Sequence, residues 1–400
     1  MRCSVMPFKG AHRYPGAFVG DTPGTHLPPD FFPLQDSIAL FAEAQATQLW
    51  LSYTIPMGPV AVGGHDQFGD IGSERYVRFM QWACWSPLFW PIDEGDINIL
   101  FWLYKSPYLD ALRQSYRLRG ALVPYTYTLA WRAATDSLPF IRPMWWDNPQ
   151  GGVDLAQART QYFYGDVLVR PVAEWTGMAA AHGSNVSVCL PSPGHWTSWD
   201  GETHYVGPQN LSVHASLSDT PLFVPSGVAI PLWPPGRRTV PPNSRPIMWL
   251  LWAPSSSSSH SAGSGFLYQD DGESLEYRTT GGGGSVETRL NFTVSLSSLT
   301  VHIRASSTAA IGAGVVLQLR GFSALVPANV TANGVPVRLA AAPHDYGRPG
   351  IWQQSDINAE PACTAKSWVV VCPRLPTKEL NISLHWKPKS QSAAHKTDDK

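Results

Sequence analysis

The stretch MGPVAVGGHD, residues 57–66, decides the fold of the first part of this 400-residue chain. A short apolar run bounded by glycines is typical of a buried strand, and this one ends in a histidine and an aspartate. The earlier stretch HRYPGAFVGDT, residues 12–22, has the same order: the apolar run AFV, then Gly20 and Asp21. We therefore expect two buried strands, each with an acidic side chain just beyond its end.

Helical patterns alternate with these strands. After Asp36, a suitable helix cap, residues 38–49 carry apolar side chains close to helical spacing. Residues 73–85 predict a second helix that is capped by Ser73 and ends before a Ser-Pro pair.

A longer helical pattern covers residues 106–134, with Ser106 as the expected cap and Pro107 in the first turn. Pro124 is expected to kink or split it, because proline lacks a backbone N–H. Residues 138–146, LPFIRPMWW, predict another strand. This alternation of strands and helices favours a parallel α/β sheet or barrel.

After about residue 150 the helical periodicity fades and Gly, Pro, Ser and Thr become frequent. Residues 289–296, RLNFTVSL, alternate so that Leu290 and Phe292 point inward while Asn291 points to solvent. Residues 299–305 repeat the pattern. Several such strands with turn signals between them predict β-sandwich domains.

Three loops and a tail interrupt this region. We expect flexible loops at 255–265, SSSSSHSAGSG, and at 281–284, GGGG, and a disordered tail at 387–400. The stretch YQDDGES, 268–274, has two adjacent acids in a glycine turn. It could bind a cation, although a solvated loop is the favoured interpretation.

Composition limits the partners. The formal net charge is −1, so nothing favours nucleic acid or an anionic membrane. No run of eighteen apolar residues predicts a membrane span, and residues 1–15 lack the apolar core of a signal peptide.

The chain nevertheless has five N-x-S/T sequons among ten asparagines, where chance gives about one or two. Cys363 and Cys372 could join two antiparallel segments in an oxidising compartment. We therefore expect a glycoprotein of the secretory pathway or extracellular space, and a chain that is the C-terminal part of a longer protein. The sequon asparagines are Asn185, Asn210, Asn291, Asn329 and Asn381.

Asp21 and Asp66 follow predicted strands, where α/β barrels place functional side chains, and Asp147 marks a third zone. Paired carboxylates on separate strands suit acid/base chemistry or polyol binding. The alternative is that each aspartate only caps a helix or a turn. A metal site would use these two aspartates with His12 and His65, but no metal-ligand spacing supports it. We expect no metal and no cofactor.

Eight stretches, taken in order, resemble glycoside hydrolase family 31, which includes α-glucosidases and α-xylosidases. The resemblance runs from residue 12 to about 280. The stretches are HRYPGAFVGDT, GGHDQFGD, ERYVRFMQWACWSPLF, YRLRGALVPYTYTLAWRAATDSLPFIRP, YFYGDVLVRPV, HWTSWDGE, PLFVPSGVAIPLW and FLYQDDGESLEY.

The resemblance implies retaining hydrolysis of terminal α-linked glycosides in carbohydrate metabolism. Asp21 matches the family's general acid/base. Asp66 matches an aspartate that binds sugar hydroxyls, and His65 and Arg13 lie in the matching substrate-binding stretches. The implied partner is an oligosaccharide or another α-glycoside substrate.

The implied fold is α/β followed by all-β. It predicts the C-terminal part of a (β/α)8 TIM barrel at 1–148, a proximal β-sandwich at 149–236 and a distal β-sandwich at 237–386.

Three departures bear on activity. The family's nucleophile lies upstream of the matched region, so we expect this chain to lack it and to need a missing N-terminal half. Trp90 and Ile92 stand where relatives carry an arginine and a histidine, and Gln67 and Phe68 add bulk to a glycine loop. The isolated chain is therefore expected to be inactive. The alternative is a catalytically inactive carbohydrate-binding or structural remnant.

Overall fold

A computed structural model describes about half of the chain, in two compact units. The first unit comprises Met1–Trp199, His204–Pro225 and Glu360–Ala362, and the second comprises Asp200–Thr203, Ser226–Ala359 and Cys363–Lys400. The described residues are 74, 76–78, 80–87, 104–147, 160–172, 182–234, 245–252, 260–278, 284–295, 297–307, 314–320, 325–337, 350–353, 368–372 and 378–388.

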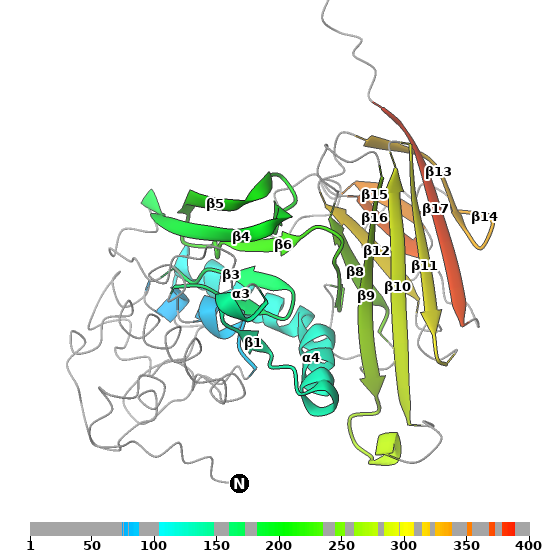
Figure 1. Cartoon of the computed structure of the whole chain (residues 1–400), viewed down its shortest axis with the longest axis horizontal. Coiled ribbons are helices and arrows are strands. Elements are labelled where there is room, and N and C mark those ends of the chain that lie inside the picture. Colours follow the sequence, from blue (N-terminus) through cyan, green and yellow to red (C-terminus); the bar gives the residue numbers. More distant parts are fainter. Residues whose placement is uncertain are drawn as a thin grey trace, which may run out of the picture. The chain divides into compact units, whose positions relative to one another are not determined.

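Helices dominate the described residues before residue 141 (Figure 1). The described residues between 74 and 83 are helical, as their pattern predicts. The long helical pattern forms α3 (Tyr108–Ala121) and α4 (Val123–Asp136), with Pro124 in the first turn of α4. The predicted split at Pro124 is therefore confirmed, because a residue without an N–H is accommodated only in the first turn of a new helix.

The start of α3 differs from the prediction. Its cap is Pro107, which makes no side-chain cap hydrogen bond. The Ser106 hydroxyl instead donates to Asp110 Oδ2 at 2.6 Å, so it contacts a side chain of the first turn rather than a backbone N–H.

One six-stranded sheet completes the first unit, in the order β1-β2-β3-β6-β4-β5, and every neighbouring pair is antiparallel. Its strands are β1 (Ile141–Arg142), β2 (Tyr162–Tyr164), β3 (Val167–Val169), β4 (Ser184–Ser198), β5 (His204–Ala215) and β6 (Leu222–Pro225).

The strand predicted at 138–146 is wrong in extent. Only β1 is extended, and a helical turn, α5 (Met144–Asp147), follows it at once. Pro143 cannot donate to the ladder, and its carbonyl accepts the Trp146 N–H at 3.0 Å, which starts the turn. Asp147 therefore lies at the end of α5 and not at the end of a strand.

The described part of residues 1–148 does not form a closed barrel. It consists of helices and the short strand β1, which pairs antiparallel with β2. The predicted barrel strands at 17–19 and 57–62 lie outside the described residues. Of the helices that the structure describes, none is both long and apolar enough to cross a membrane.

The second unit contains two sheets (Figure 1). One has six strands in the order β14-β13-β17-β11-β10-β9, and the other has five in the order β15-β16-β12-β8-β7, with β8 and β12 parallel. The strands are β7 (Ala229–Leu232), β8 (Ile247–Trp252), β9 (His260–Asp270), β10 (Ser285–Ser295), β11 (Ser298–Ala305), β12 (Val315–Arg320), β13 (Leu325–Ala332), β14 (Val335–Pro336), β15 (Gly350–Gln353), β16 (Trp368–Cys372) and β17 (Glu379–Pro388), and the short 3-10 helix η6 (Glu276–Arg278) follows β9.

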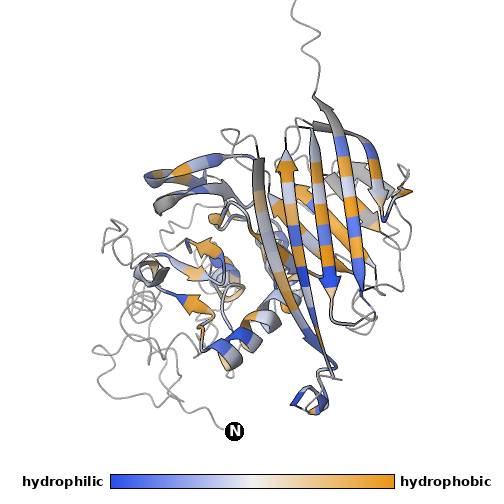
Figure 2. Cartoon of the chain, turned by 45° about the vertical axis from the view of Figure 1, so that its right-hand side comes forward, coloured by the Kyte–Doolittle hydropathy of each residue, from blue (hydrophilic) through white to orange (hydrophobic). Residues whose placement is uncertain are grey.

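Apolar side chains from both sheets of the second unit meet in one core. Leu290 and Phe292 on β10 are buried while Asn291 between them is exposed, and β11 repeats the alternation. Figure 2 shows this as alternating hydrophobic and hydrophilic bands along the strands. The patterns at 289–296 and 299–305 therefore predict these strands and their inward faces correctly.

The predicted loop at 255–265 is partly wrong, because β9 already begins at His260. Its glycines allow close packing rather than flexibility. A Cβ on Gly263 would lie 2.3 Å from the Phe292 ring, and one on Gly265 would lie 2.6 Å from the Trp249 ring. The small residues that suggest a loop, Gly263 and Gly265, therefore belong to a strand that packs tightly against aromatic rings.

The predicted link between Cys363 and Cys372 is not formed. Cys372 is a free thiol, 1% exposed, in the core between the two sheets. Burial raises the pKa of its thiol to about 12.

The strand β17 continues through Pro388, two residues into the predicted tail. β7 pairs with β8 within the second unit. The domain ranges 149–236 and 237–386 remain predictions.

Candidate active site

The four predicted site residues lie outside the described residues: Arg13, Asp21, His65 and Asp66. The departures at Gln67, Phe68, Trp90 and Ile92 lie there as well. The structure therefore describes the elements that directly follow the candidate residues along the chain.

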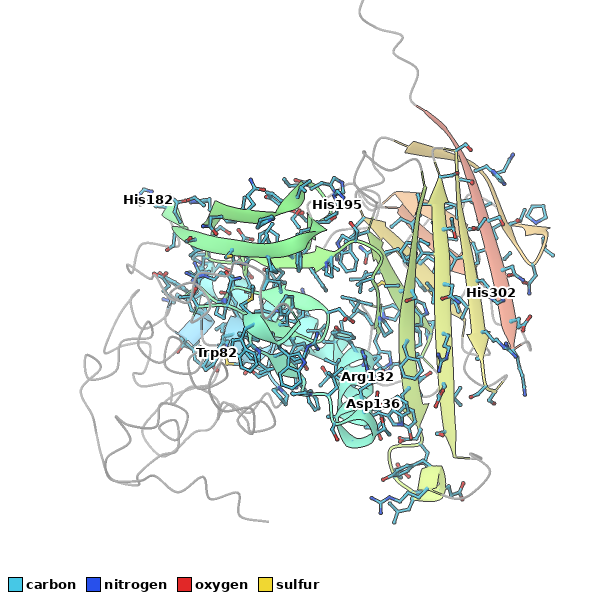
Figure 3. The ribbon with its side chains drawn as sticks, viewed as in Figure 1. Trp82, Arg132, Asp136, His182, His195 and His302 are labelled. Carbon is cyan, nitrogen blue, oxygen red and sulfur yellow. The ribbon has the colours of Figure 1, made fainter. Side chains whose placement is uncertain are left out.

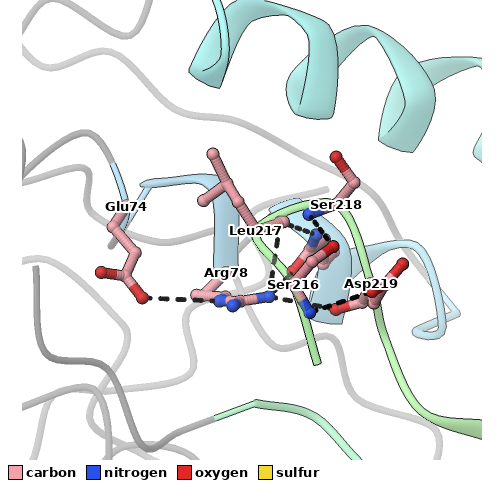
Figure 4. Close-up of polar contacts among 7 residues, drawn as sticks. Glu74, Arg78, Ser216, Leu217, Ser218 and Asp219 are labelled. Carbon is pink, nitrogen blue, oxygen red and sulfur yellow. Dashed lines mark hydrogen bonds and ion pairs between the residues drawn. The ribbon is translucent and has the colours of Figure 1, made fainter. Parts of the chain in front are cut away.

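A buried polar network anchors the helix that follows Asp66 (Figure 4). Arg78 is 1% exposed, and its Nη1 donates to Gln81 Oε1 at 3.0 Å and to the Asp219 carbonyl at 3.0 Å. Gln81 Nε2 donates to the Leu217 carbonyl at 2.7 Å. The helix is thus joined to the β5–β6 connection, 141 residues further along the chain.

Charge within the network is balanced locally. Glu74 Oε1 lies 3.8 Å from Arg78 Nε, one helical turn away, and both side chains are fully buried. A buried guanidinium is tolerated only with a counter-charge and hydrogen-bond acceptors, and Glu74 and the carbonyls supply both.

The turn at 216–219, whose carbonyls accept these hydrogen bonds, is held in shape by its own aspartate. Asp219 Oδ2 accepts the Ser216 N–H at 2.9 Å, so the turn closes on its own side chain and holds its carbonyls toward Arg78. The sequence ERYVRFMQ already places Glu74, Arg78 and Gln81 on one helical face, but it contains no signal for their partner turn.

Arg119 on α3 fixes the segment at the other end of the same helix. Its guanidinium donates to three carbonyls, those of Cys84 at 3.0 Å, Ser86 at 2.6 Å and Pro87 at 2.8 Å. Positive charge at the carbonyl end of a helix is favourable, because the last carbonyls lack partners within the helix. Arg119 therefore holds the described turn at 84–87 that follows the helix.

Aromatic rings pack around this segment. Trp85 is fully buried and meets Tyr164 and Trp199 edge-on, with ring centroids 5.9 and 5.3 Å apart. The Tyr162 hydroxyl donates to the Trp85 carbonyl at 3.0 Å. These are contacts of a packed core, not of an open ring surface for sugar.

The titratable groups of this cluster are neutral. Burial raises the pKa of the Cys84 thiol to about 12 and raises the pKa of the Tyr76 and Tyr162 hydroxyls. Raised pKa values favour the neutral forms of these three groups near neutral pH, which suits packing better than acid/base chemistry.

In the acidic turn at 268–274, the Asp270 and Asp271 carboxylates accept hydrogen bonds from the turn's own backbone. Asp271 Oδ1 accepts the N–H groups of Glu273 and Ser274 at 3.1 and 3.0 Å, and the Ser274 hydroxyl lowers the pKa of Asp271. Asp270 Oδ1 accepts the Gly272 N–H at 2.9 Å. Over the part of the chain that the structure describes, no three His, Cys, Asp or Glu side chains are grouped to hold a metal.

Two family models match this chain. "Glycosyl hydrolases family 31 TIM-barrel domain" matches residues 4–129, and "Glycosyl hydrolase family 31 C-terminal domain" matches residues 137–230. Together they cover more than half of the chain.

Two curated relatives are α-glucosidases by name. The neutral alpha-glucosidase AB of Homo sapiens is 32% identical over 223 residues, which is 54% of this chain and 22% of the relative. An alpha-glucosidase of Aspergillus oryzae (strain ATCC 42149 / RIB 40) is 30% identical over 279 residues, which is 67% of this chain and 25% of the relative. The chain thus spans about a quarter of the length of these relatives.

Solved structures share the fold. A family 31 dextranase of Flavobacterium johnsoniae, complexed with isomaltotriose, gives a TM-score of 0.63 at 23% identity over 80% of this chain and 38% of that one. An alpha-1,4-glucan lyase of Gracilariopsis lemaneiformis gives 0.67 at 15% identity, over 88% of this chain and 36% of that one. With the two family models and the named relatives, the finding is plain: this chain belongs to glycoside hydrolase family 31.

Proposed function

We propose that this chain serves retaining hydrolysis of terminal α-linked glycosides, with Asp21 as the general acid/base. Asp66, His65 and Arg13 bind the sugar whose bond is cut. The substrate is an oligosaccharide or another α-glycoside, and the chemistry uses no metal or cofactor.

One observation carries the proposal: the family's barrel-domain model matches residues 4–129, which contain all four candidate residues. The names of the α-glucosidase relatives support the same reaction class.

The chemistry gives each carboxyl a task. Retaining glycosidases use two carboxyl groups about 5 Å apart. While a nucleophilic carboxylate attacks the anomeric carbon, Asp21 protonates the departing oxygen, and it then takes a proton from the water that releases the sugar. Asp66 stays ionised and accepts sugar hydroxyls. The 400 residues contain no W-x-D-M-N-E-like stretch for the nucleophile, so we propose that turnover needs a segment that supplies it.

The described contacts support a positioning role for the flanking elements. Asp66 and Trp90 precede and follow the helix at 74–83 along the chain. Arg78 anchors the middle of that helix, and Arg119 anchors the turn that directly follows it. Both anchors join residues that are distant in sequence, so they fix the described helix and the turn after it within the first unit.

The test is hydrolysis of 4-nitrophenyl α-glucoside by the chain alone and by the chain mixed with a family segment that carries the nucleophile strand. We expect release of nitrophenol only in the mixture. Asp21→Asn should reduce that rate by about 10²–10⁴-fold, the usual contribution of a general acid/base. Asp36→Asn, a carboxylate outside the proposed site, is the control and should leave the rate unchanged.

A second candidate is a carbohydrate-binding or structural remnant without turnover, which the changes at Phe68, Trp90 and Ile92 favour. Calorimetry with maltose separates the two. Binding that Asp66→Asn abolishes, together with an inactive mixture, supports the second candidate; turnover in the mixture overturns it.

A further inference from the structure

All five sequon asparagines lie on strands and are exposed. Asn185 and Asn210 lie on β4 and β5 of the first unit, and Asn291, Asn329 and Asn381 lie on β10, β13 and β17 of the second. The middle residue of each second-unit sequon is a buried core residue: Phe292, Val330 and Ile382.

Strand alternation alone explains part of this pattern. An exposed–buried–exposed triplet is polar–apolar–polar in any half-buried strand. Alternation does not explain why five of the chain's ten asparagines are followed two residues later by serine or threonine. It does place the asparagine and the hydroxyl on the same wet face.

Three sequons lie on the outer face of the six-stranded sheet of the second unit, β14-β13-β17-β11-β10-β9. Asn291 and Asn381 lie on either side of His302 of β11, so they are two strand spacings, about 10 Å, apart. Asn329 lies opposite His385 of β17. Figure 3 labels His302 on this sheet.

The sequon hydroxyls form a single row across the same face. Thr293 and Ser383 each lie opposite Thr300, and Thr331 lies opposite Ser383. The three sequons therefore share one registered patch, although 90 residues separate the first from the last.

The described neighbours of Asn291 and Asn381 are polar. The cross-strand neighbours of Asn291 are Ser264 and His302, and Asn381 has Asn333 at its side. Among the described residues, the exposed large apolar side chains of the second unit are Leu275 and Val335, and neither lies on β10, β11 or β17. On β10, β11 and β17, the described side chains therefore form no exposed apolar patch.

We propose that Asn291, Asn329 and Asn381 are N-glycosylation sites, so that the outer face of this sheet is covered by glycans. In the transfer step the asparagine Nδ2 displaces a lipid pyrophosphate from C1 of a lipid-linked oligosaccharide. A C–N bond replaces the C–O bond, and one amide proton leaves. Because the three side chains point away from the core, the attached glycans leave the packing of the second unit intact.

The test expresses the full chain behind a secretion signal in a eukaryotic host and removes glycans with an N-glycanase, which converts each occupied asparagine to aspartate. We expect peptide mass spectrometry to find aspartate at all three positions. Each single Asn→Gln variant should lose one step of the mobility shift. Asn333→Gln is the matched control, because Asn333 is exposed beside Asn381 but is followed by Gly-Val, so the change should leave the number of glycans unchanged.

Substitutions at the hydroxyl separate modification from folding. Thr293→Ser keeps the sequon and should retain the glycan at Asn291, whereas Thr293→Ala should remove it with the fold unchanged by circular dichroism. The proposal is overturned if Asn185 or Asn210 is modified, which proves passage through the transfer machinery, while Asn291, Asn329 and Asn381 stay unmodified. It is equally overturned if the exported chain carries no glycan at all.

Discussion

The two units differ in how many polar side chains they bury among the described residues. Of the buried polar or charged residues that the structure describes, twelve lie in the first unit and three in the second. The first unit includes the fully buried Glu74–Arg78 pair, while the second has one continuous apolar core between two sheets. The difference teaches that the first unit adds directed hydrogen bonds between buried polar groups to its apolar clusters, whereas the second relies mainly on alternation of apolar residues.

The largest loss in the free energy of unfolding is expected from Arg78→Ala. The change leaves the Glu74 carboxylate and two carbonyls buried without their cation, which costs about 3–5 kcal/mol. Urea unfolding should report this loss, and hydrogen exchange should speed up in the 204–225 peptides but not in β10 or β11. Arg113→Ala is the control. Its ion pair with Asp110 is about half exposed on both sides, so its loss should cost about 0–1 kcal/mol. Equal losses in the two variants would contradict the importance of the network.

The core of the second unit is tested by Leu290→Ala. Leu290 is fully buried between the sheets, so truncation should cost about 2–5 kcal/mol, through lost burial and a cavity. Thr293→Ala, on the exposed side of the same strand, should stay within about 0.5 kcal/mol. Unfolding curves of the two variants that coincide would refute the inward and outward assignment of β10.

A pair of glycines compares the tight packing of the first unit with an open turn of the second. Gly165 has φ +57°, and a Cβ there would lie 2.2 Å from the Tyr125 hydroxyl oxygen, whereas Gly272 has φ +72° with nothing within 4 Å. Both Ala variants meet left-handed backbone strain of about 1–2 kcal/mol. Only Gly165→Ala adds overpacking of about 1–3 kcal/mol. Thermal unfolding that ranks Gly272→Ala as the worse variant would contradict this account.

The smallest change in the free energy of unfolding is expected from Cys363→Ala. Because Cys372 is a free buried thiol, the change should alter the free energy of unfolding by about 0.5 kcal/mol or less. A disulfide would instead contribute about 2–4 kcal/mol. A non-reducing peptide map checks the same point, and a Cys363–Cys372 peptide in it would contradict the structure. Alkylation at pH 8 should spare Cys372 in the folded chain, because burial raises its thiol pKa to about 12.

Local patterns predicted much of the described fold. The alternation at 289–296 and 299–305 predicted β10 and β11 with their buried sides, because period two in apolarity directly encodes a half-buried strand. Pro124 predicted the break between α3 and α4, because the missing N–H acts locally.

Long-range contacts were not predictable. Arg78 meets carbonyls 139 and 141 residues away, and a carbonyl has no sequence signature. The glycines of β9 suggested a loop, because nothing in the local sequence shows that they lie close to Phe292 and Trp249. These close approaches arise only when the strands pack together. For the candidate site, the sequence predicted the residues and their roles through family motifs, but the geometry of Asp21 and Asp66 lies outside the described residues.

The role of Asp21 is tested most directly by azide rescue. In the mixture with the nucleophile-bearing segment, Asp21→Asn should hydrolyse an activated aryl α-glucoside slowly, and azide should accelerate release of the phenol and yield α-glucosyl azide. Azide needs no general base, so it replaces water at the covalent intermediate, and two inversions retain the α configuration. Asp66→Asn should show no acceleration, because its defect is in binding. An Asp21→Asn variant that hydrolyses as fast as the wild type, or that gives no azide product, would contradict the assignment.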